Sequence, residues 1–393
     1  MAELLSVDEA LRAVLGRVQP LPPERVRLEA AVGRVLAEPA RALVDLPPFP
    51  SSAMDGFAVR AADTPGRLPV VARIPAGRPA SRPLRPGEAM AIATGGVVPD
   101  GADTVVPIER VDVSGEEIDV PEAAGPGGNV RPRGGDVAAG DVVVEPGTRL
   151  GSAQIGALAA AGVGQVDCAL GPRVAVLTTG TELRRPGEPL APGEIYESNG
   201  AMLRALLAGA GAVVEVLDSV EDDGAAHRAA IERGLEHDVL VTSGGVSVGP
   251  HDLVRRIEAE LGVDEVFWGV SVKPGKPLAF GVRGRTLVFG LPGNPVSSLV
   301  SSVLFVLPAL RALQGERDPE PRYDRGVLAR AVVPDPRRDE LVRARLTRDG
   351  GLEPLSGQES HMIVRTAGAN ALVYVPTGSE ELPTGSAVRF LRL

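Results

Sequence analysis

The stretch from residue 172 to residue 315 constrains the fold most strongly, because short hydrophobic runs alternate there with helical patterns. The runs VAVL, VVEVL and DVLVTS contain mainly aliphatic and β-branched residues, and amphipathic segments separate them. Alternation of this kind is typical of βαβ units, which build a parallel sheet with helices on both of its faces. We therefore expect a doubly wound α/β domain in this part of the chain.

The regions on either side follow other patterns. Residues 1–45 are predicted to be mostly helical, and residues 152–163 are predicted to form a second short helix that packs against the first. Between residue 46 and about residue 150, short β-branched runs alternate with Pro/Gly turns, which is typical of an all-β domain. Residues 320–393 return to short β patterns and predict a small C-terminal β domain.

Charge and composition argue against nucleic-acid and membrane partners. The net charge is −10 and aromatic residues make up only 3% of the chain, whereas nucleic-acid surfaces use basic stripes and stacking rings. The N-terminus has acids where a signal peptide carries positive charge, and the most apolar run, 295–310, contains four serines, so we expect a buried helix there. The single Cys168 rules out an internal disulfide framework and fits a reducing compartment. The expected location is the cytoplasm.

The two lysines of the chain stand out against 39 arginines, because both lie in the five-residue stretch KPGKP, as Lys273 and Lys276. Lysine carries a compact ammonium group on a flexible stem, whereas arginine carries a planar fork. Their placement in a chain that otherwise uses arginine indicates a need for two ammonium groups at one place. The alternative is a drift of composition toward arginine that left these two positions unchanged.

Acidic side chains follow the strands of the predicted parallel sheet, at the edge where ligands gather in open sheets. Glu182, Asp222 and Asp252 all lie in loops at this edge. Together with the lysines, these carboxylates could hold a magnesium ion that bridges phosphate oxygens. For Asp222 or Asp252 taken alone, a helix cap is the better explanation. The residues by themselves indicate a phosphate- or anion-binding α/β enzyme with β appendages.

Two further motifs have both a functional and a plain structural interpretation. SGGVSVG, at 243–249, offers backbone N–H groups to an anion at a helix N-terminus, or it is an ordinary strand-to-helix turn. In SSAMDGFAVR, Asp55 precedes Gly56 just before a predicted strand. An acid before glycine is common turn chemistry, so Asp55 either binds its own backbone or serves a site.

Seven motifs occur in one order along nearly the whole chain: SSAMDGFAVR, IATGGVVPDGADTVVPIE, NVRPRGGD, TTGTEL, TSGGVSVG, KPGKP and GLPGNPVS. Together they closely resemble the MoeA and gephyrin E-domain family, the molybdopterin molybdotransferases. The resemblance implies a multidomain α/β plus β fold and an elongated homodimer. Its four domains would be an N-terminal helical and linking domain in two pieces (1–45 and 137–171), an inserted β domain (46–136), the doubly wound domain (172–318) and a C-terminal domain like a β-barrel (319–393).

The resemblance also implies a reaction. Members of that family take adenylylated molybdopterin and molybdate, cleave the phosphoanhydride with magnesium, and release AMP while the dithiolene holds molybdenum. The expected catalytic residues are Asp55, Asp136, Glu182, Lys273 and Lys276. Magnesium would be held by Asp222 and Asp252. The positions that match oxyanion and substrate contacts are Lys273, Lys276, Pro277, Ser247, Ser297, Arg343 and Ser360, with Asp55, Thr94, Arg131 and Asp136 reaching the site from the β domain of the other subunit.

Some positions depart from the pattern of the family. Thr181 stands where many relatives have Asp, Phe57 replaces a common Tyr, and MIVRTAGAN follows His361 where serines are frequent. Two other functions stay open: a scaffold that binds molybdopterin without turnover, and the related adenylyltransferase, which consumes ATP. Other molybdenum cofactor enzymes are the expected protein partners.

Overall fold

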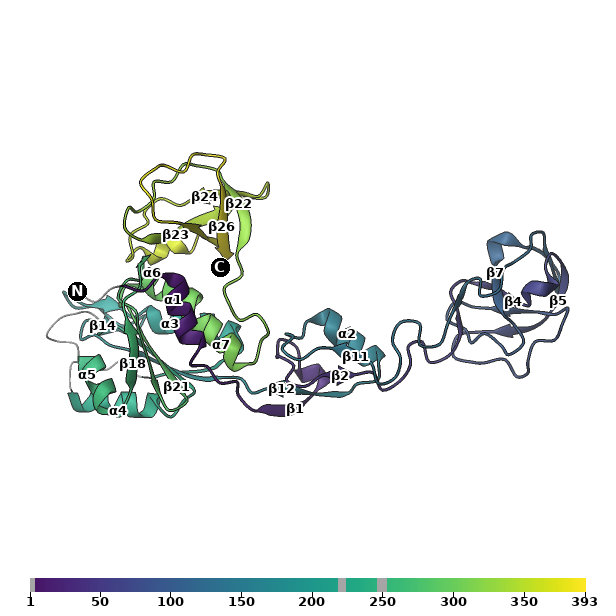
Figure 1. Ribbon diagram of the computed structural model, residues 1–393, viewed down its shortest axis with the longest axis horizontal. Coiled ribbons are helices and arrows are strands. Elements are labelled where there is room, and N and C mark those ends of the chain that lie inside the picture. The colour runs from purple at the N-terminus through teal and green to yellow at the C-terminus, as the bar shows by residue number, and fades with distance from the viewer. Residues whose placement is uncertain (1–3, 218–223, 246–252) are drawn as a thin grey trace. The chain divides into compact units, whose positions relative to one another are not determined.

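The computed structural model describes residues 4–217, 224–245 and 253–393, which form two compact units (Figure 1). Unit 1 comprises Met1–Glu24, Gly33–Ala37 and Ala169–Leu393. Unit 2 comprises Arg25–Val32 and Glu38–Cys168. Unit 1 therefore contains both the predicted doubly wound region and the predicted C-terminal β region.

Unit 2 contains a six-stranded sheet formed by β4 (Gly56–Val59), β5 (Gly66–Ile74), β6 (Ala89–Ile92), β7 (Thr104–Pro107), β8 (Asp112–Ser114) and β9 (Glu117–Val120). Two single turns of 3-10 helix follow β4 and β7, at η2 (Ala61–Asp63) and η3 (Ile108–Arg110). All four residues of β4 are buried, since this strand lies between β6 and β7. Successive side chains point to opposite faces of a strand, so Phe57 packs in one small core and Ala58 in another.

Gly56, the glycine after Asp55, is required by the close approach of two strands. A Cβ atom at this position would lie 2.1 Å from the carbonyl oxygen of Val106 in β7, which is a backbone atom that cannot turn aside. We expect Gly56→Ala to destabilise the β sheet of unit 2 by about 2–4 kcal/mol, measured as a lower denaturant midpoint. Gly125→Ala is the matched control, because a Cβ there meets nothing within 4 Å. Equal midpoints for the two variants would contradict the steric explanation.

The rest of unit 2 consists of short strands and one helix: η1 (Leu28–Ala30), β2 (Ala40–Arg41), β3 (Ser51–Ser52), β10 (Val130–Arg131), β11 (Val142–Val144) and α2 (Ser152–Ala160). β2 pairs with β11 and β3 pairs with β10. Each pair joins a segment before the six-stranded sheet to one after it, which makes the sheet an insertion. A further pair is formed by β1 (Pro23–Arg27) and β12 (Gln165–Ala169).

The large sheet of unit 1 is formed by β13 (Arg173–Thr178), β16 (Val213–Val216), β17 (Val239–Ser243), β18 (Asp264–Trp268), β20 (Ala279–Arg283) and β21 (Thr286–Leu291). Its order is β16-β13-β17-β21-β20-β18. The first four strands are parallel, and β20 and β18 add an antiparallel edge. A short parallel pair, β14 (Leu183–Arg184) with β15 (Ile195–Tyr196), lies in the long connection after β13.

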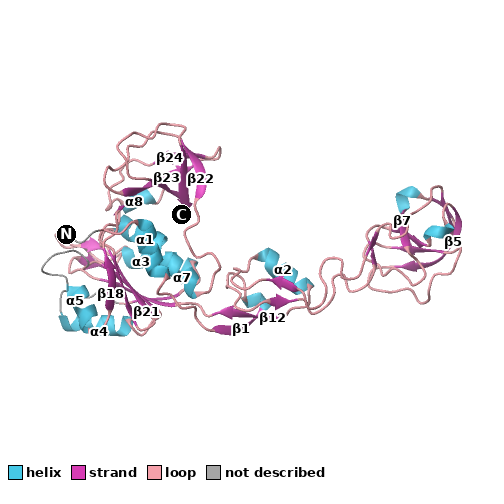
Figure 2. Ribbon diagram, viewed as in Figure 1, coloured by secondary structure: helices cyan, strands magenta, loops and turns pink. Residues whose placement is uncertain are grey.

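Helices cover both faces of this sheet (Figure 2). One face carries α1 (Val7–Leu15), α3 (Asn199–Gly209), α6 (Pro295–Ser301) and α7 (Leu307–Leu313). The other face carries α4 (Gly224–Gly234) and α5 (Leu253–Glu260). The predicted doubly wound α/β fold is therefore confirmed.

The N-terminal helix is shorter than predicted and packs against the large sheet. Ser6 and Glu9 form a capping box at the start of α1, but the helix ends at Leu15, and the prolines at 20, 22 and 23 lead into β1. α1 contacts α7, whereas α2 contacts β11 and η1. The buried face of α1 packs in the core of the large sheet of unit 1.

The apolar run after β21 is a core helix. It consists of α6, a π-helical segment at Ser302–Val306 (η4) and α7. By length and composition, Pro295–Leu313 is the one helix among the described residues that could cross a membrane, yet 83% of its most apolar window is buried within the protein. The prediction of a buried helix is confirmed.

The C-terminal region of unit 1 is a closed barrel with its own core, formed by β22 (Asp324–Leu328), β23 (Asp339–Leu346), β24 (Gly351–Pro354), β25 (Ala371–Val375) and β26 (Ala387–Arg392). The ring closes because β23 pairs with both β24 and β25. A short helix, α8 (Ile363–Thr366), precedes β25. β19 (Val272–Lys273) also pairs with β23, and its Lys273 stands opposite Glu340. This pairing fixes one end of the KPGKP stretch to the barrel.

Candidate functional site

A buried network of polar side chains holds the loop after β21 against the end of β17. The Asn199 side-chain amide donates to Ser243 Oγ at 2.9 Å and to the Gly293 carbonyl at 2.8 Å. Ser298 Oγ donates to the Pro292 carbonyl at 2.6 Å. These buried hydrogen bonds tie α3 and α6 to the loop after β21. Because such bonds rigidify their surroundings, the start of α6 is fixed at the carboxyl edge of the parallel strands.

The KPGKP stretch forms a tight loop on the first turns of the same helix. Gly275 has φ +121°, and a Cβ there would lie 2.9 Å from Ser301 Oγ, so only glycine fits. The carbonyl of Lys276 accepts hydrogen bonds from the backbone N–H groups of Val270 and Leu278, at 3.0 and 2.9 Å. The two lysines are therefore held on either side of one turn.

Both lysines line a cavity of about 300 Å³ between this loop, α6 and the barrel. Five of the predicted residues meet there: Lys273, Lys276, Pro277, Ser297 and Ser360. The structure adds residues that the sequence reasoning missed, namely Asn294, Arg338, Gln358 and Glu359. A larger cavity, of about 380 Å³, lies beside α5, but it contains neither lysine, and Arg255 at its rim is paired with Glu265. The smaller cavity has the chemistry of an anion site.

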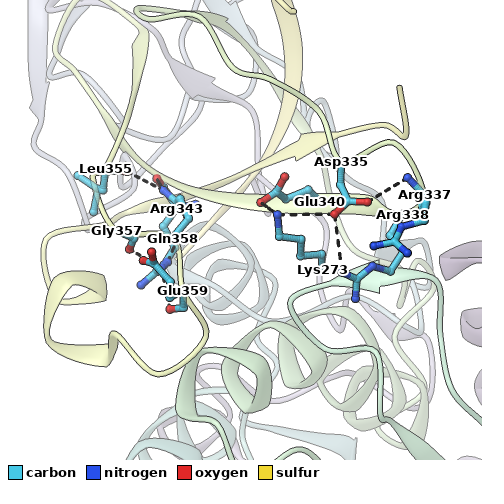
Figure 3. Close-up of polar contacts among 10 residues, drawn as sticks. All are labelled: Lys273, Asp335, Arg337, Arg338, Glu340, Arg343, Leu355, Gly357, Gln358 and Glu359. Carbon is cyan, nitrogen blue, oxygen red and sulfur yellow. Dashed lines mark hydrogen bonds and ion pairs between the residues drawn. The ribbon is translucent and has the colours of Figure 1, made fainter. Parts of the chain in front are cut away.

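The two lysines differ in their electrostatic partners. Lys273 Nζ lies 3.3 Å from Glu340 Oε1 and 3.6 Å from Asp335 Oδ2 (Figure 3). Asp335 also lies 3.7 Å from the guanidinium of Arg338. Lys276 is exposed and forms no ion pair with any residue that the structure describes. Of the two lysines, Lys276 is thus the one whose charge has no counter-ion among the described residues.

The hydrogen bond from the Arg337 backbone N–H lowers the pKa of Asp335, and the charges of Arg338 and Lys273 lower it further. The pKa of Asp335 therefore lies below its ordinary value, which favours the ionised carboxylate. An ionised Asp335 keeps two cations, Lys273 and Arg338, beside the cavity.

Arg343 does not line this cavity, although the resemblance implied a substrate contact. Its side chain is only 1% exposed, and burial lowers its pKa. Its guanidinium points instead into the loop that contains Ser360 (Figure 3).

Three of the motifs of unit 2 meet at one end of its sheet. Asp55 Oδ1 accepts hydrogen bonds from the backbone N–H of Thr94 at 2.7 Å and from its hydroxyl at 2.9 Å, which lower the pKa of Asp55. Arg131 pairs with Ser51, just before Asp55. Asp55, Thr94 and Arg131 are all exposed, whereas the backbone N–H of Asp136 is bonded to Leu46 near the base of the insertion. Asp55 of the SSAMDGFAVR motif is therefore hydrogen-bonded to Thr94 of the IATGG motif.

The predicted magnesium ligands Asp222 and Asp252, and also Ser247, lie outside the described residues. Glu182 is described and exposed. Within 4–217, 224–245 and 253–393, no group of three His, Cys, Asp or Glu side chains could hold a metal ion. The magnesium site thus stays a prediction.

Comparison with known families accounts for this arrangement along nearly the whole chain. Residues 5–162 match the "MoeA N-terminal region (domain I and II)", residues 175–312 a "probable molybdopterin binding domain", and residues 325–393 the "MoeA C-terminal region (domain IV)".

Full-length relatives agree. "Molybdopterin molybdenumtransferase 2" of Mycobacterium tuberculosis (strain ATCC 25618 / H37Rv) is 37% identical over 98% of both chains. "Molybdopterin molybdenumtransferase" of Bacillus subtilis (strain 168) is 33% identical over 98% of this chain and 94% of its own. The crystal structure of the molybdopterin biosynthesis moeA protein from Pyrococcus horikoshii OT3 superimposes with a TM-score of 0.87, at 29% identity and full coverage of both chains. The chain belongs to the MoeA family.

Proposed function

We propose that this protein is a molybdopterin molybdenumtransferase that inserts molybdenum from molybdate into adenylylated molybdopterin, with release of AMP. The observation that carries the proposal is the cavity where the only two lysines of the chain meet Ser297 and Ser360. Molybdate is a tetrahedral dianion, and ammonium, guanidinium and hydroxyl donors are the groups that bind such an anion.

The test is to incubate the purified protein with adenylylated molybdopterin, magnesium and molybdate, and to measure AMP and active cofactor. Release of AMP that depends on molybdate would support the proposal. A scaffold would bind the substrate and release none. An adenylyltransferase would consume ATP and form the adenylylated compound instead. The three functions therefore give three different product patterns.

The proposal includes magnesium, held by Asp222 and Asp252 with Glu182 nearby. Carboxylate oxygens are the ligands that this hard cation prefers, and at this site it would neutralise charge on the phosphates. The side chains that line the cavity, among them Lys276, Ser297 and Ser360, have the separate task of binding and orienting the two substrates.

We expect Asp252→Asn to bind adenylylated molybdopterin normally but to release AMP roughly a hundredfold more slowly, because Asn keeps the shape and loses the charge that magnesium needs. Equilibrium dialysis measures the binding, and chromatography measures AMP over a range of magnesium concentrations. Asp264→Asn, at an exposed carboxylate that starts β18, is the control. Wild-type AMP release by Asp252→Asn at ordinary magnesium would remove Asp252 from the site.

We further propose a cytoplasmic homodimer with the four domains expected from the sequence. Apolar groups are exposed beside α2, where Leu43 is 67% and Val44 is 42% accessible and only Leu158 of the helix is buried. Leu43 and α2 are neighbours, because the Leu43 N–H donates to the carbonyl of Ala161. An exposed apolar patch of this kind supports self-association. In such a dimer, Asp55 would serve the active site of the partner subunit.

A further inference from the structure

Arg343, in β23, is the largest fully buried side chain among the described residues. Its Nη1 donates to the carbonyl of Met362 at 2.8 Å and to Thr366 Oγ1 at 2.8 Å. Its Nη2 donates to the carbonyls of Gly357 at 2.7 Å and Glu359 at 3.2 Å. Its Nε donates to Gln358 Oε1 at 3.4 Å. A guanidinium has five N–H groups, so every one of them is used by the segment before α8 and by α8 itself.

The loop that Arg343 holds, residues 357–362, forms the barrel side of the cavity of about 300 Å³ that contains both lysines, called the oxyanion cavity below. Gln358, Glu359 and Ser360 line the cavity, and Arg343 does not. The carbonyl of Ser360 also accepts a hydrogen bond from the backbone N–H of Val296, at the start of α6. The backbone around Ser360 is therefore held on one side by Arg343 and on the other by the helix that carries Ser297.

Gln358 strengthens this link between β23 and the loop. Its side-chain oxygen accepts from the backbone N–H of Arg343 at 3.0 Å, and its side-chain nitrogen donates to the carbonyls of Arg343 at 3.0 Å and Leu355 at 2.8 Å. A network in which each polar group has a partner fixes one conformation.

We propose that Arg343 is a positioning residue that sets the Ser360 side of the oxyanion cavity, and that it is not itself a ligand of the oxyanion. This inference rests on the proposed function. Its physical basis is the geometry of the fork: a planar guanidinium can reach carbonyls on both sides of a turn, whereas an oxyanion would have to displace at least one of these bonds. Arg343 acts on the anion through the loop.

Two substitutions separate positioning from direct binding. Arg343→Lys keeps the positive charge and loses the fork, so we expect molybdate to bind roughly tenfold to a hundredfold more weakly. Thr366→Val removes one acceptor of the guanidinium, at a buried residue outside the cavity lining, and keeps the shape of the side chain. We expect it to weaken molybdate binding by about threefold to tenfold, the scale of one ordinary hydrogen bond, because the effect reaches the anion only through the loop. Direct binding predicts unchanged or tighter binding for Thr366→Val, because an N–H group is freed.

The measurement is calorimetric titration of the full-length protein with molybdate alone, accompanied by amide hydrogen exchange of residues 357–362 without any anion. Faster exchange in this loop for both variants, together with weaker binding, would support the inference. Arg345→Lys is the control, an exposed arginine of the same strand, and should change neither quantity. If Thr366→Val bound molybdate with wild-type affinity, or if its loop exchanged at the wild-type rate, the inference would be overturned while the proposed function would stand. Failure of the wild-type protein to bind molybdate would overturn the proposed function, and this inference with it.

Discussion

A Lys276→Met variant is expected to bind molybdate roughly a hundredfold more weakly than the wild-type protein, while unfolding at the same denaturant concentration. Lys276 is exposed and has no ion pair among the residues that the structure describes, so its ammonium group is free to meet an oxyanion. Removing such a charge-assisted contact costs about 1.5–3 kcal/mol, or up to about a hundredfold in affinity. Methionine keeps the unbranched stem, so packing is conserved. The measurement is half-saturation by molybdate in the AMP release assay, beside a denaturation curve.

Lys273→Met provides the contrast within the same loop. It removes a second cation from the cavity, and it also leaves Glu340 and Asp335 without their shared partner. We expect weaker molybdate binding together with a loss of about 1–2 kcal/mol in stability, less than for a fully buried pair because Lys273 is 41% exposed. Unchanged half-saturation by molybdate in Lys276→Met would remove that lysine from the oxyanion site.

The pH dependence of Lys273→Met follows from Asp335. Because its pKa is lowered in the folded protein, Asp335 contributes stability above the pKa of the unfolded chain, and this contribution is lost as pH falls through the lower, folded pKa. Lys273 is one cause of that lowering. In the variant the folded pKa moves back toward its ordinary value, so we expect the variant to lose stability at a higher pH than the wild-type protein on acid titration.

The lysines and the strand-end loops could be predicted because each leaves a local signal. Lys273 and Lys276 stand out in an arginine-rich chain, and alternating strand and helix patterns place the loop GLPGNP, just before Ser297, at the carboxyl edge of a parallel sheet. Parallel strands all end at the same edge, so chain order alone brings their loops together. For the same reason, the helices on both faces of the sheet followed from the pattern.

Arg338 left no such signal. It is one of 39 arginines, and its place beside the cavity depends on the pairing of β19 with β23, two segments far apart in sequence. The role of Arg343 was hidden for a related reason. In β23, residues on both faces are buried, so alternation does not show where a side chain points. Only the folded loop reveals that its five donors are already used.

The packing of α1 also could not be predicted from local sequence, because it depends on contacts with segments far away in the chain. The heptad-like spacing of its apolar residues predicts a buried face, and that face is buried. The spacing does not specify which surface covers it, because the partner is chosen by long-range complementarity between the helix and the core of the large sheet. The short strands β1 and β2 were likewise missed, since two- to five-residue strands that pair only with distant segments have little local pattern.

Mixing Asp55→Ala and Lys276→Ala homodimers, each inactive at molybdate concentrations near the wild-type half-saturation point, is expected to restore AMP release at about a quarter of all sites. We propose this because Asp55 and Thr94 form an exposed, bonded pair in an inserted domain, and the resemblance implies that this pair serves the partner subunit. In an isologous dimer, each site then takes Asp55 from one chain and Lys276 from the other. The two inactive proteins would be unfolded and refolded together, and AMP release measured on the mixture.

The arithmetic of the mixture decides between the two arrangements. A mixed dimer places both substitutions in one site and leaves the second site with a native Asp55 and a native Lys276. Random pairing makes about half of the dimers mixed, so about a quarter of all sites are intact. If Asp55 served its own subunit, every site in the mixture would carry one substitution, and no activity would return. Two differently tagged chains, purified through both tags, prove that mixed dimers have formed. Absence of AMP release from that doubly purified fraction would therefore assign Asp55 to the active site of its own chain.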